Sequence, residues 1–108
     1  MIDFTVWKSK DQYRGFAFKG HAGYAEEGSD IVCAAVSALA LNTANSIEAF
    51  TEDFFEQKLS EDGGYLQMDF PNGTGEKASL LMDSLILGIR GIEADYGTEY
   101  ITLTFEEV

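Results

Sequence analysis

The sequence GHAGYAEEGSDIVCAAVSALAL, residues 20–41, consists of a polar, glycine-rich part followed by an apolar, alanine-rich part. It contains the only histidine of the chain, His21, and the only cysteine, Cys33. Residues 20–30 are rich in glycine and acid and lack a sustained apolar period, which is typical of a mobile loop. The pattern changes at Ile31, where alanine and leucine, both strong helix formers, become dense. The stretch therefore predicts a loop that leads directly into a helix.

The start of this helix places Cys33 in or next to its first turn. Ser29 and Asp30 precede the alanine-rich run, and their side-chain oxygens can accept hydrogen bonds from unpaired amides of a first turn. Those amides and the positive end of the helix dipole favour a thiolate over a thiol. Cys33 is therefore a candidate nucleophile.

His21 stands at the far end of the same loop, and the intervening residues are long enough to fold back on Cys33. An imidazole beside a thiol can take its proton and so activate the sulfur for attack. The alternative to a catalytic role is that Cys33 and His21 are ordinary structural residues. Cysteine is among the most often buried residue types, and lone cysteines and histidines occur in many chains without chemistry.

Three kinds of neighbouring residue complete the candidate site. Asp30 would either orient His21, as the third member of a triad does, or cap the helix. Gly23 and Gly28 flank residues 24–27 and are candidate hinges that line the site, since glycine adopts positive φ freely. Ser37 lies one helical turn beyond Cys33, where it either lines the site or bonds to its own helix backbone.

The order and spacing of these residues resemble the signature of the ribosomal-processing cysteine protease family called Prp. The matching positions are Gly20-His21-Ala22-Gly23, Gly28, Asp30 and Val32-Cys33-Ala34-Ala35-Val36-Ser37. Many relatives have glycine where Ala25 stands here, and this departure leaves the histidine and the cysteine in place.

In that family the equivalent histidine and cysteine form the catalytic pair of an enzyme that removes a short N-terminal extension from a large-subunit ribosomal protein. The resemblance thus implies that His21 is the base and Cys33 the nucleophile. It also implies a homodimer and a cleavage site with a short hydrophobic motif. The alternative from a different functional class is a non-enzymatic acidic module that binds a basic ribosomal partner, with Cys33 inert.

The charge of the chain bears on its partners. It has 19 acidic and 7 basic residues, a formal net charge of −12. Such a surface repels phosphate backbones and attracts cations, so we expect a basic protein tail as partner and no direct binding to nucleic acid. Solubility alone is a simpler reason for the same charge.

Length and composition set further limits. A chain of 108 residues predicts one domain, 1–108, whose core needs neither metal nor disulfide. One cysteine cannot form an internal disulfide, and residues 1–8 do not resemble a signal peptide, so we expect a cytoplasmic protein without a membrane span. No zinc-binding cluster and no phosphate-binding glycine loop is recognisable, and no cofactor or metal is expected.

Hydrophobic periodicity predicts the remaining fold. Alternating patterns indicate strands over 2–9, 13–20, 65–70 and 99–105, with Phe16 and Phe18 on the same face as Arg14. Helical spacing indicates helices from 31 to about 55, with a possible break, and over 76–92. Residues 56–64 read as a polar connection. The order β-β-α-β-α-β predicts an α+β two-layer sandwich, with a four-stranded sheet covered on one face by helices.

Overall fold

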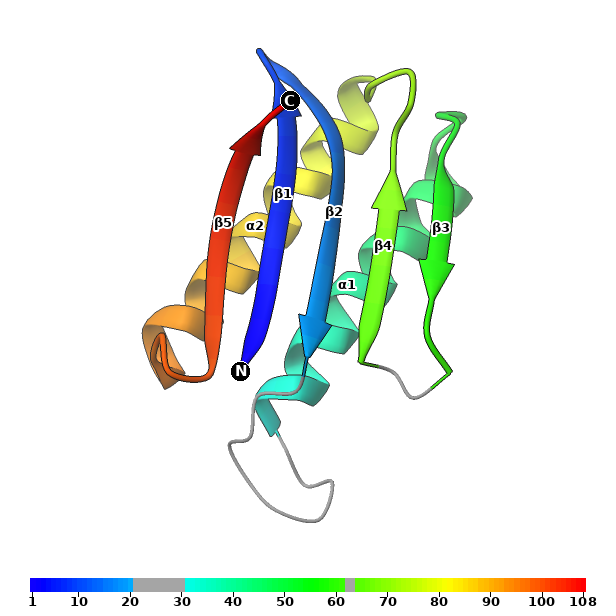
Figure 1. Cartoon of the computed structure of the whole chain (residues 1–108). Coiled ribbons are helices and arrows are strands. Elements are labelled where there is room, and N and C mark those ends of the chain that lie inside the picture. Colours follow the sequence, from blue (N-terminus) through cyan, green and yellow to red (C-terminus); the bar gives the residue numbers. More distant parts are fainter. Residues whose placement is uncertain (21–30, 62–63) are drawn as a thin grey trace.

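The computed structural model describes residues 1–20, 31–61 and 64–108, and it consists of a five-stranded mixed sheet with two helices packed against one face (Figure 1). Along the chain the elements are β1 (Ile2–Ser9), β2 (Gln12–Gly20), α1 (Ile31–Phe50), β3 (Glu56–Leu59), β4 (Tyr65–Asp69), α2 (Glu76–Tyr96) and β5 (Ile101–Glu107). Across the sheet the order is β3-β4-β2-β1-β5, with only β5 parallel to its neighbour. The predicted α+β class and its helix-covered face are confirmed.

The β1–β2 hairpin forms the centre of the sheet. Its apolar residues alternate, so that Ile2, Phe4 and Val6 of β1 are fully buried beneath the helices. The ring of Phe4 stacks on Phe16 of β2 at a centroid distance of 5.7 Å and on Phe18 at 6.5 Å. These cross-strand aromatic pairs fix the register, because a shift by one residue would turn them toward solvent.

The prediction that Arg14 shares a face with Phe16 and Phe18 is wrong. The β1–β2 register shifts at Trp7/Lys8, where Gly15 pairs with Trp7 and Tyr13 pairs with Lys8. Arg14 is the extra residue of this bulge, which breaks the strict alternation along the strand. Its side chain lies on the face of the sheet away from the helices, beside Trp7 and Asp69.

The prediction of four strands is also wrong, because residues 56–59 form a fifth strand, β3, within the predicted polar connection. All four residues, Glu56-Gln-Lys-Leu59, are exposed. The strand pairs only with β4 and lies at the edge of the sheet, so polar residues suit it and no apolar alternation marks it. The true order is β-β-α-β-β-α-β.

Helix α1 ends at Phe50, five residues before the predicted limit. Both the backbone N–H and the hydroxyl of Thr51 donate to the carbonyl oxygen of Ile47, at 3.1 and 2.7 Å. The carboxylate of Asp53 accepts a hydrogen bond from the N–H of Gly75, the residue before α2. Residues 51–55 therefore lead from α1 to β3 instead of continuing the helix, and Asp53 bonds them to the start of α2.

The two helices pack side by side through a close contact between Leu39 of α1 and Gly88 of α2. A Cβ atom on Gly88 would lie only 2.7 Å from a methyl carbon of Leu39, so a larger residue there would force the Leu39 side chain to shift. Helix α2 extends four residues beyond the predicted end, to Tyr96, and Gly97 ends it with a φ of 103°. Strand β5 accordingly starts two residues later than predicted.

Among the described residues, α1 is the one helix long and apolar enough to cross a membrane, judged by length and composition alone. Its buried residues contribute to the core formed with the sheet and α2, and they are Val32, Val36, Ala40, Thr43, Ala44 and Ile47. Core helices of ordinary globular domains pass the same test, and this packing accounts for part of the apolar character of α1.

Tyr13 joins the sheet to α2, and it generates a prediction about stability. Its hydroxyl donates to Asp83 and its ring lies 5.0 Å from the Lys8 ammonium. Burial, followed by the bond to Asp83, raises the pKa of Tyr13 from 10.0 to about 12. The native state thus holds this proton more tightly than the unfolded chain. The resulting stabilisation is complete below pH 10 and disappears as the pH rises through about 12.

We therefore expect Tyr13→Phe to lower the free energy of unfolding by about 1 kcal/mol at pH 8, the usual contribution of one hydrogen bond. Urea denaturation at pH 8 and pH 11 provides the measurement. The native chain should lose more stability between these pH values than the variant does, and an equal loss in both would contradict this role for Tyr13.

Candidate active site

Cys33 is the third residue of α1, and the prediction that it lies in the first turn of a helix is confirmed. Its side chain is half-buried and packs against the core cluster. The N–H groups of a first helical turn point out of the helix end, which gives the start of α1 a partial positive charge. The position combines a fixed thiol with local positive potential.

Several elements converge at the end of the molecule where α1 begins. Strand β2 ends there at Gly20, and the β3–β4 connection lies at the same end (Figure 1). The N–H of Gly20 donates to the carbonyl of Gly64 at 2.8 Å, which ties the last residue of β2 to this connection. His21 follows Gly20 directly in the sequence.

Gly20 itself is required by its geometry. Its φ of +104° lies in a region that side chains rarely tolerate, and a Cβ atom there would overlap the carbonyl oxygen of Met1. Gly20 belongs to the sequence motif, but the motif alone does not reveal this backbone constraint. A glycine at the end of a strand, directly before a candidate base, was the available signal.

Ser37 lies one turn beyond Cys33 in α1 and is half-buried. In the part of the chain that the structure describes, its hydroxyl makes no hydrogen bond to the α1 backbone, in contrast to Thr43, whose hydroxyl donates to the Leu39 carbonyl at 2.8 Å.

The predicted positions of His21, Gly23, Gly28 and Asp30 lie outside the described residues. Within the described residues no cluster of three or more His, Cys, Asp or Glu side chains could hold a metal ion.

Comparison with known proteins identifies the family. The profile described as cysteine protease Prp matches residues 1–102. The ribosomal processing cysteine protease Prp of Bacillus subtilis is 37% identical over 103 residues, which cover 89% of this chain and 90% of that protein. The chain belongs to the Prp family of ribosomal processing cysteine proteases.

Solved structures of similar proteins agree with this assignment. The Prp protease of Staphylococcus aureus, in complex with a covalently linked product peptide, superposes with a TM-score of 0.90 at 25% identity, covering 98% of this chain and 100% of that one. A protein of Streptococcus mutans superposes with a TM-score of 0.86 at 34% identity, covering 100% and 96%. The resemblance in the sequence motif therefore extends over the whole fold of a Prp protease.

The geometry of Gly20 predicts the effect of one substitution. Gly20→Ala should lower the free energy of unfolding by about 1 to 3 kcal/mol, because the alanine is strained at this φ and meets the Met1 carbonyl. The matched control is Gly91→Ala in α2, where a Cβ atom meets nothing within 4 Å. That variant should gain up to about 1 kcal/mol, since alanine favours helix. Urea denaturation measures both, and equal stabilities would exclude the proposed strain.

Proposed function

We propose that this Prp protease is an endopeptidase that removes the N-terminal extension of a large-subunit ribosomal protein, with Cys33 as nucleophile and His21 as base. The observation that carries the proposal is the position of the only cysteine in the first turn of α1, in a chain that belongs to a cysteine protease family. The curated relative from Bacillus subtilis is named a ribosomal processing protease, which supports the substrate class.

The proposed reaction needs only side chains of this chain and water. His21 takes the thiol proton of Cys33, and the sulfur attacks the carbonyl carbon of the scissile peptide bond. The C–N bond of the tetrahedral intermediate then breaks, and His21 donates its proton to the leaving amine. Water hydrolyses the resulting thioester and releases the extension. The covalent product peptide on the Staphylococcus aureus relative is consistent with such a covalent route.

The oxyanion of the intermediate needs hydrogen-bond donors that point to one place. The backbone N–H of Cys33 is one candidate, because it belongs to the first turn of α1. A second donor would come from residues 28–30, directly before the helix. Asp30 would orient His21 or cap α1, and Ser37, one turn beyond Cys33, would line the site.

The partners follow from charge and exposed surface. With a net charge of −12, the enzyme suits the basic N-terminal tail of a ribosomal protein better than nucleic acid, and we place the reaction in the cytoplasm.

We also propose a homodimer. Leu87 of α2 is 74% exposed, and a second copy would cover it. Sedimentation equilibrium measures that state directly, and a monomer at all concentrations would exclude the dimer.

The first prediction of this proposal concerns Cys33. Cys33→Ser keeps the size of the side chain but replaces the thiol by an alcohol that this site should not ionise, so cleavage should vanish while folding and substrate binding remain. Mass spectrometry of the extended ribosomal protein after incubation detects the cut. Retained cleavage would exclude Cys33 as the nucleophile. Loss of the folded state, seen by circular dichroism, would show instead that Cys33 is essential to the core.

The second prediction concerns His21. His21→Ala removes proton transfer and should lower turnover by about two to four orders of magnitude, the usual range for a lost general acid–base group. Alkylation of Cys33 by iodoacetamide at neutral pH should slow as well, which separates loss of activation from loss of substrate binding. Because the chain has no other histidine, a normal cleavage rate would rule out the mechanism as stated.

A further inference from the structure

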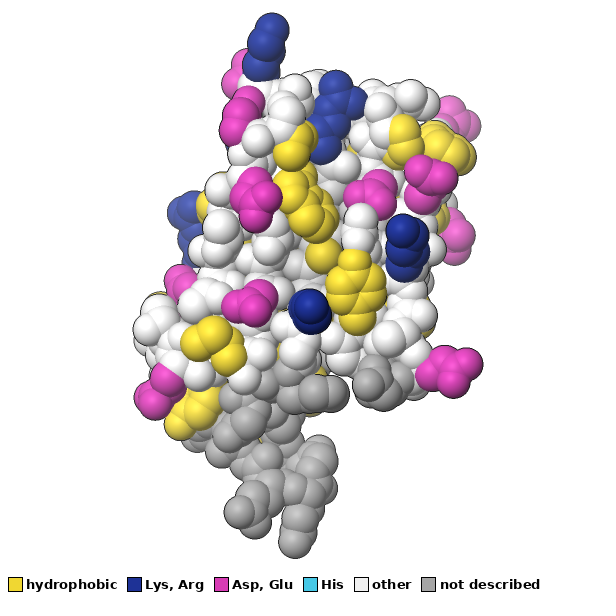
Figure 2. Space-filling model, in the orientation of Figure 1, with side chains coloured by type: hydrophobic (Ala, Val, Ile, Leu, Met, Phe, Trp, Pro, Cys, Tyr) yellow, Lys and Arg dark blue, Asp and Glu magenta, His cyan; other side chains and the backbone are white. Residues whose placement is uncertain are grey.

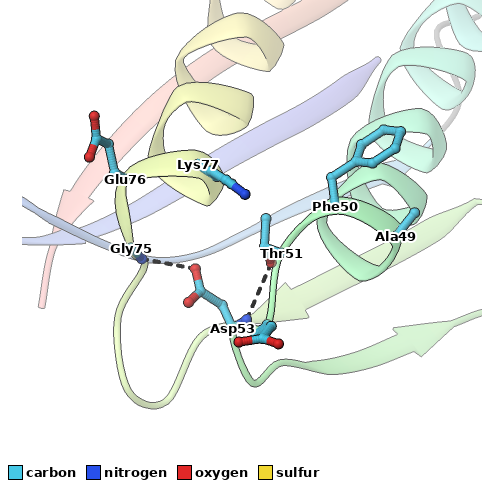
Figure 3. A pocket seen from close by; sticks show the side chains of 8 residues that line it. Ala49, Phe50, Thr51, Asp53, Gly75, Glu76 and Lys77 are labelled. Carbon is cyan, nitrogen blue, oxygen red and sulfur yellow. Dashed lines mark hydrogen bonds between the residues drawn. The ribbon is translucent and has the colours of Figure 1, made fainter.

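The ends of the two helices form an open hollow of about 720 Å³ (Figure 3). It lies at the opposite end of α1 from Cys33. The C-terminal end of α1 and the connection after it form one side, and the start of α2 forms the other. The lining residues are Ala49, Phe50, Thr51, Glu52, Asp53, Gly75, Glu76 and Lys77. None of them belongs to the candidate active site.

The walls of the hollow are held in place by hydrogen bonds. The Asp53 carboxylate accepts from the N–H of Gly75 at 2.8 Å, and the N–H of Asp53 donates to the Thr51 hydroxyl at 3.3 Å (Figure 3). The first bond joins the connection after α1 to the residue before α2, and the second lies within the connection. The hollow is thus built from both helix ends.

An exposed aromatic ring and an excess of carboxylates characterise the surface of the hollow. Phe50 is 68% exposed, although a phenylalanine ring gains most from burial. Three carboxylates, those of Glu52, Asp53 and Glu76, accompany the single ammonium group of Lys77. An aromatic face beside carboxylates favours lysine and arginine side chains, through cation–π contact and charge pairing.

We propose that this hollow is an exosite that binds a lysine- or arginine-bearing segment of the protein substrate, outside the residues next to the cut. The inference rests on the proposed function, which makes the substrate a ribosomal protein. Proteins that bind RNA carry lysine and arginine because these neutralise phosphates. The body of such a substrate therefore carries positive charge that complements the carboxylates of the hollow.

The length of α1 separates the exosite from the chemistry. Phe50 follows Cys33 by seventeen positions in one helix, which corresponds to about 25 Å at a rise of 1.5 Å per residue. An extended peptide needs about eight residues to cover this distance. A short peptide centred on the cleavage site can therefore occupy the active site without reaching the hollow, whereas the intact ribosomal protein can reach both.

This difference in reach defines the experiment. We compare kcat/KM for the intact extended ribosomal protein with kcat/KM for an eight-residue peptide that spans its cleavage site. Phe50→Ala and the double variant Glu52→Lys/Glu76→Lys should each lower kcat/KM about tenfold on the intact protein, the typical effect of truncating one anchor residue. Both should leave the peptide reaction unchanged. All three side chains are exposed, so the variants should fold.

A matched control separates a local site from the general attraction of an acidic protein. Asp95→Lys reverses an exposed charge in the last turn of α2, at the other end of that helix. It should affect the intact protein much less than reversal of Glu52 and Glu76. An equal effect of both reversals, or unchanged cleavage of the intact protein by Phe50→Ala, would overturn the exosite.

Binding is measured in parallel, in a Cys33→Ala background, so that the exosite is tested even if cleavage fails. If the wild-type chain cleaves neither substrate, the proposed function is wrong, and the exosite then stands only if Phe50→Ala weakens binding of the intact protein about tenfold. No binding of the intact protein would overturn both. If Phe50→Ala instead converts a dimer into a monomer in sedimentation, a second copy of the chain covers the hollow and the exosite is excluded.

Discussion

The packing of α1 against the β1–β2 hairpin is the contact on which the rest of this structure depends. Val32, Val36 and Ala40 share one stripe of the helix and are fully buried beneath the sheet. They belong to the same buried core cluster as the stacked rings of Phe4 and Phe16. Because this stripe begins one residue before Cys33, the burial that stabilises the fold also fixes where the thiol lies and how far it is exposed.

The face of the sheet that the helices leave uncovered carries hydrophobic and charged side chains together (Figure 2). Polar side chains on this face bond along and across the strands: along β4, Tyr65 donates to Gln67, which donates to Asp69 at 2.9 and 3.1 Å. Thr102 of β5 donates to Asp3 of β1 at 3.0 Å. The alternation of buried and polar residues along each strand thus accounts for both faces, and no second layer is needed to satisfy these groups.

Much of this fold could be predicted from the sequence, because strong local patterns carried it. The alternation at Ile2, Phe4 and Val6 and the alanine-rich start of α1 agreed with tertiary packing, so both elements were predicted correctly. Strand β3 was missed, since an exposed edge strand needs no apolar residue. The face of Arg14 was missed because a bulge depends on the pairing partner, which one strand does not reveal.

The candidate site likewise has features that the local sequence predicts and features that it does not. Placement of Cys33 in a first turn followed from local helix signals, and the structure bears it out. The contacts that hold Gly20 beside Met1 and Gly64 join residues distant in sequence, and no local pattern encodes them. The hollow at Phe50 depends on the end of α1. The prediction placed that end too late, at about residue 55, because Phe54 and Phe55 are apolar.

The two helix N-termini of this protein face different surroundings, and the difference bears on why only one suits catalysis. The start of α2 is occupied by carboxylates, since Glu76 lies in its first turn and Asp53 accepts from the N–H of Gly75. These groups offset the partial positive charge of that helix end. The first turn of α1 contains no acidic residue, and its third position is Cys33. In the proposed reaction this turn supplies both the attacking sulfur and a backbone N–H for the oxyanion. Placing both functions in one turn requires that the turn be held rigidly, and the fully buried Val32 and Val36 on either side of Cys33 meet that requirement.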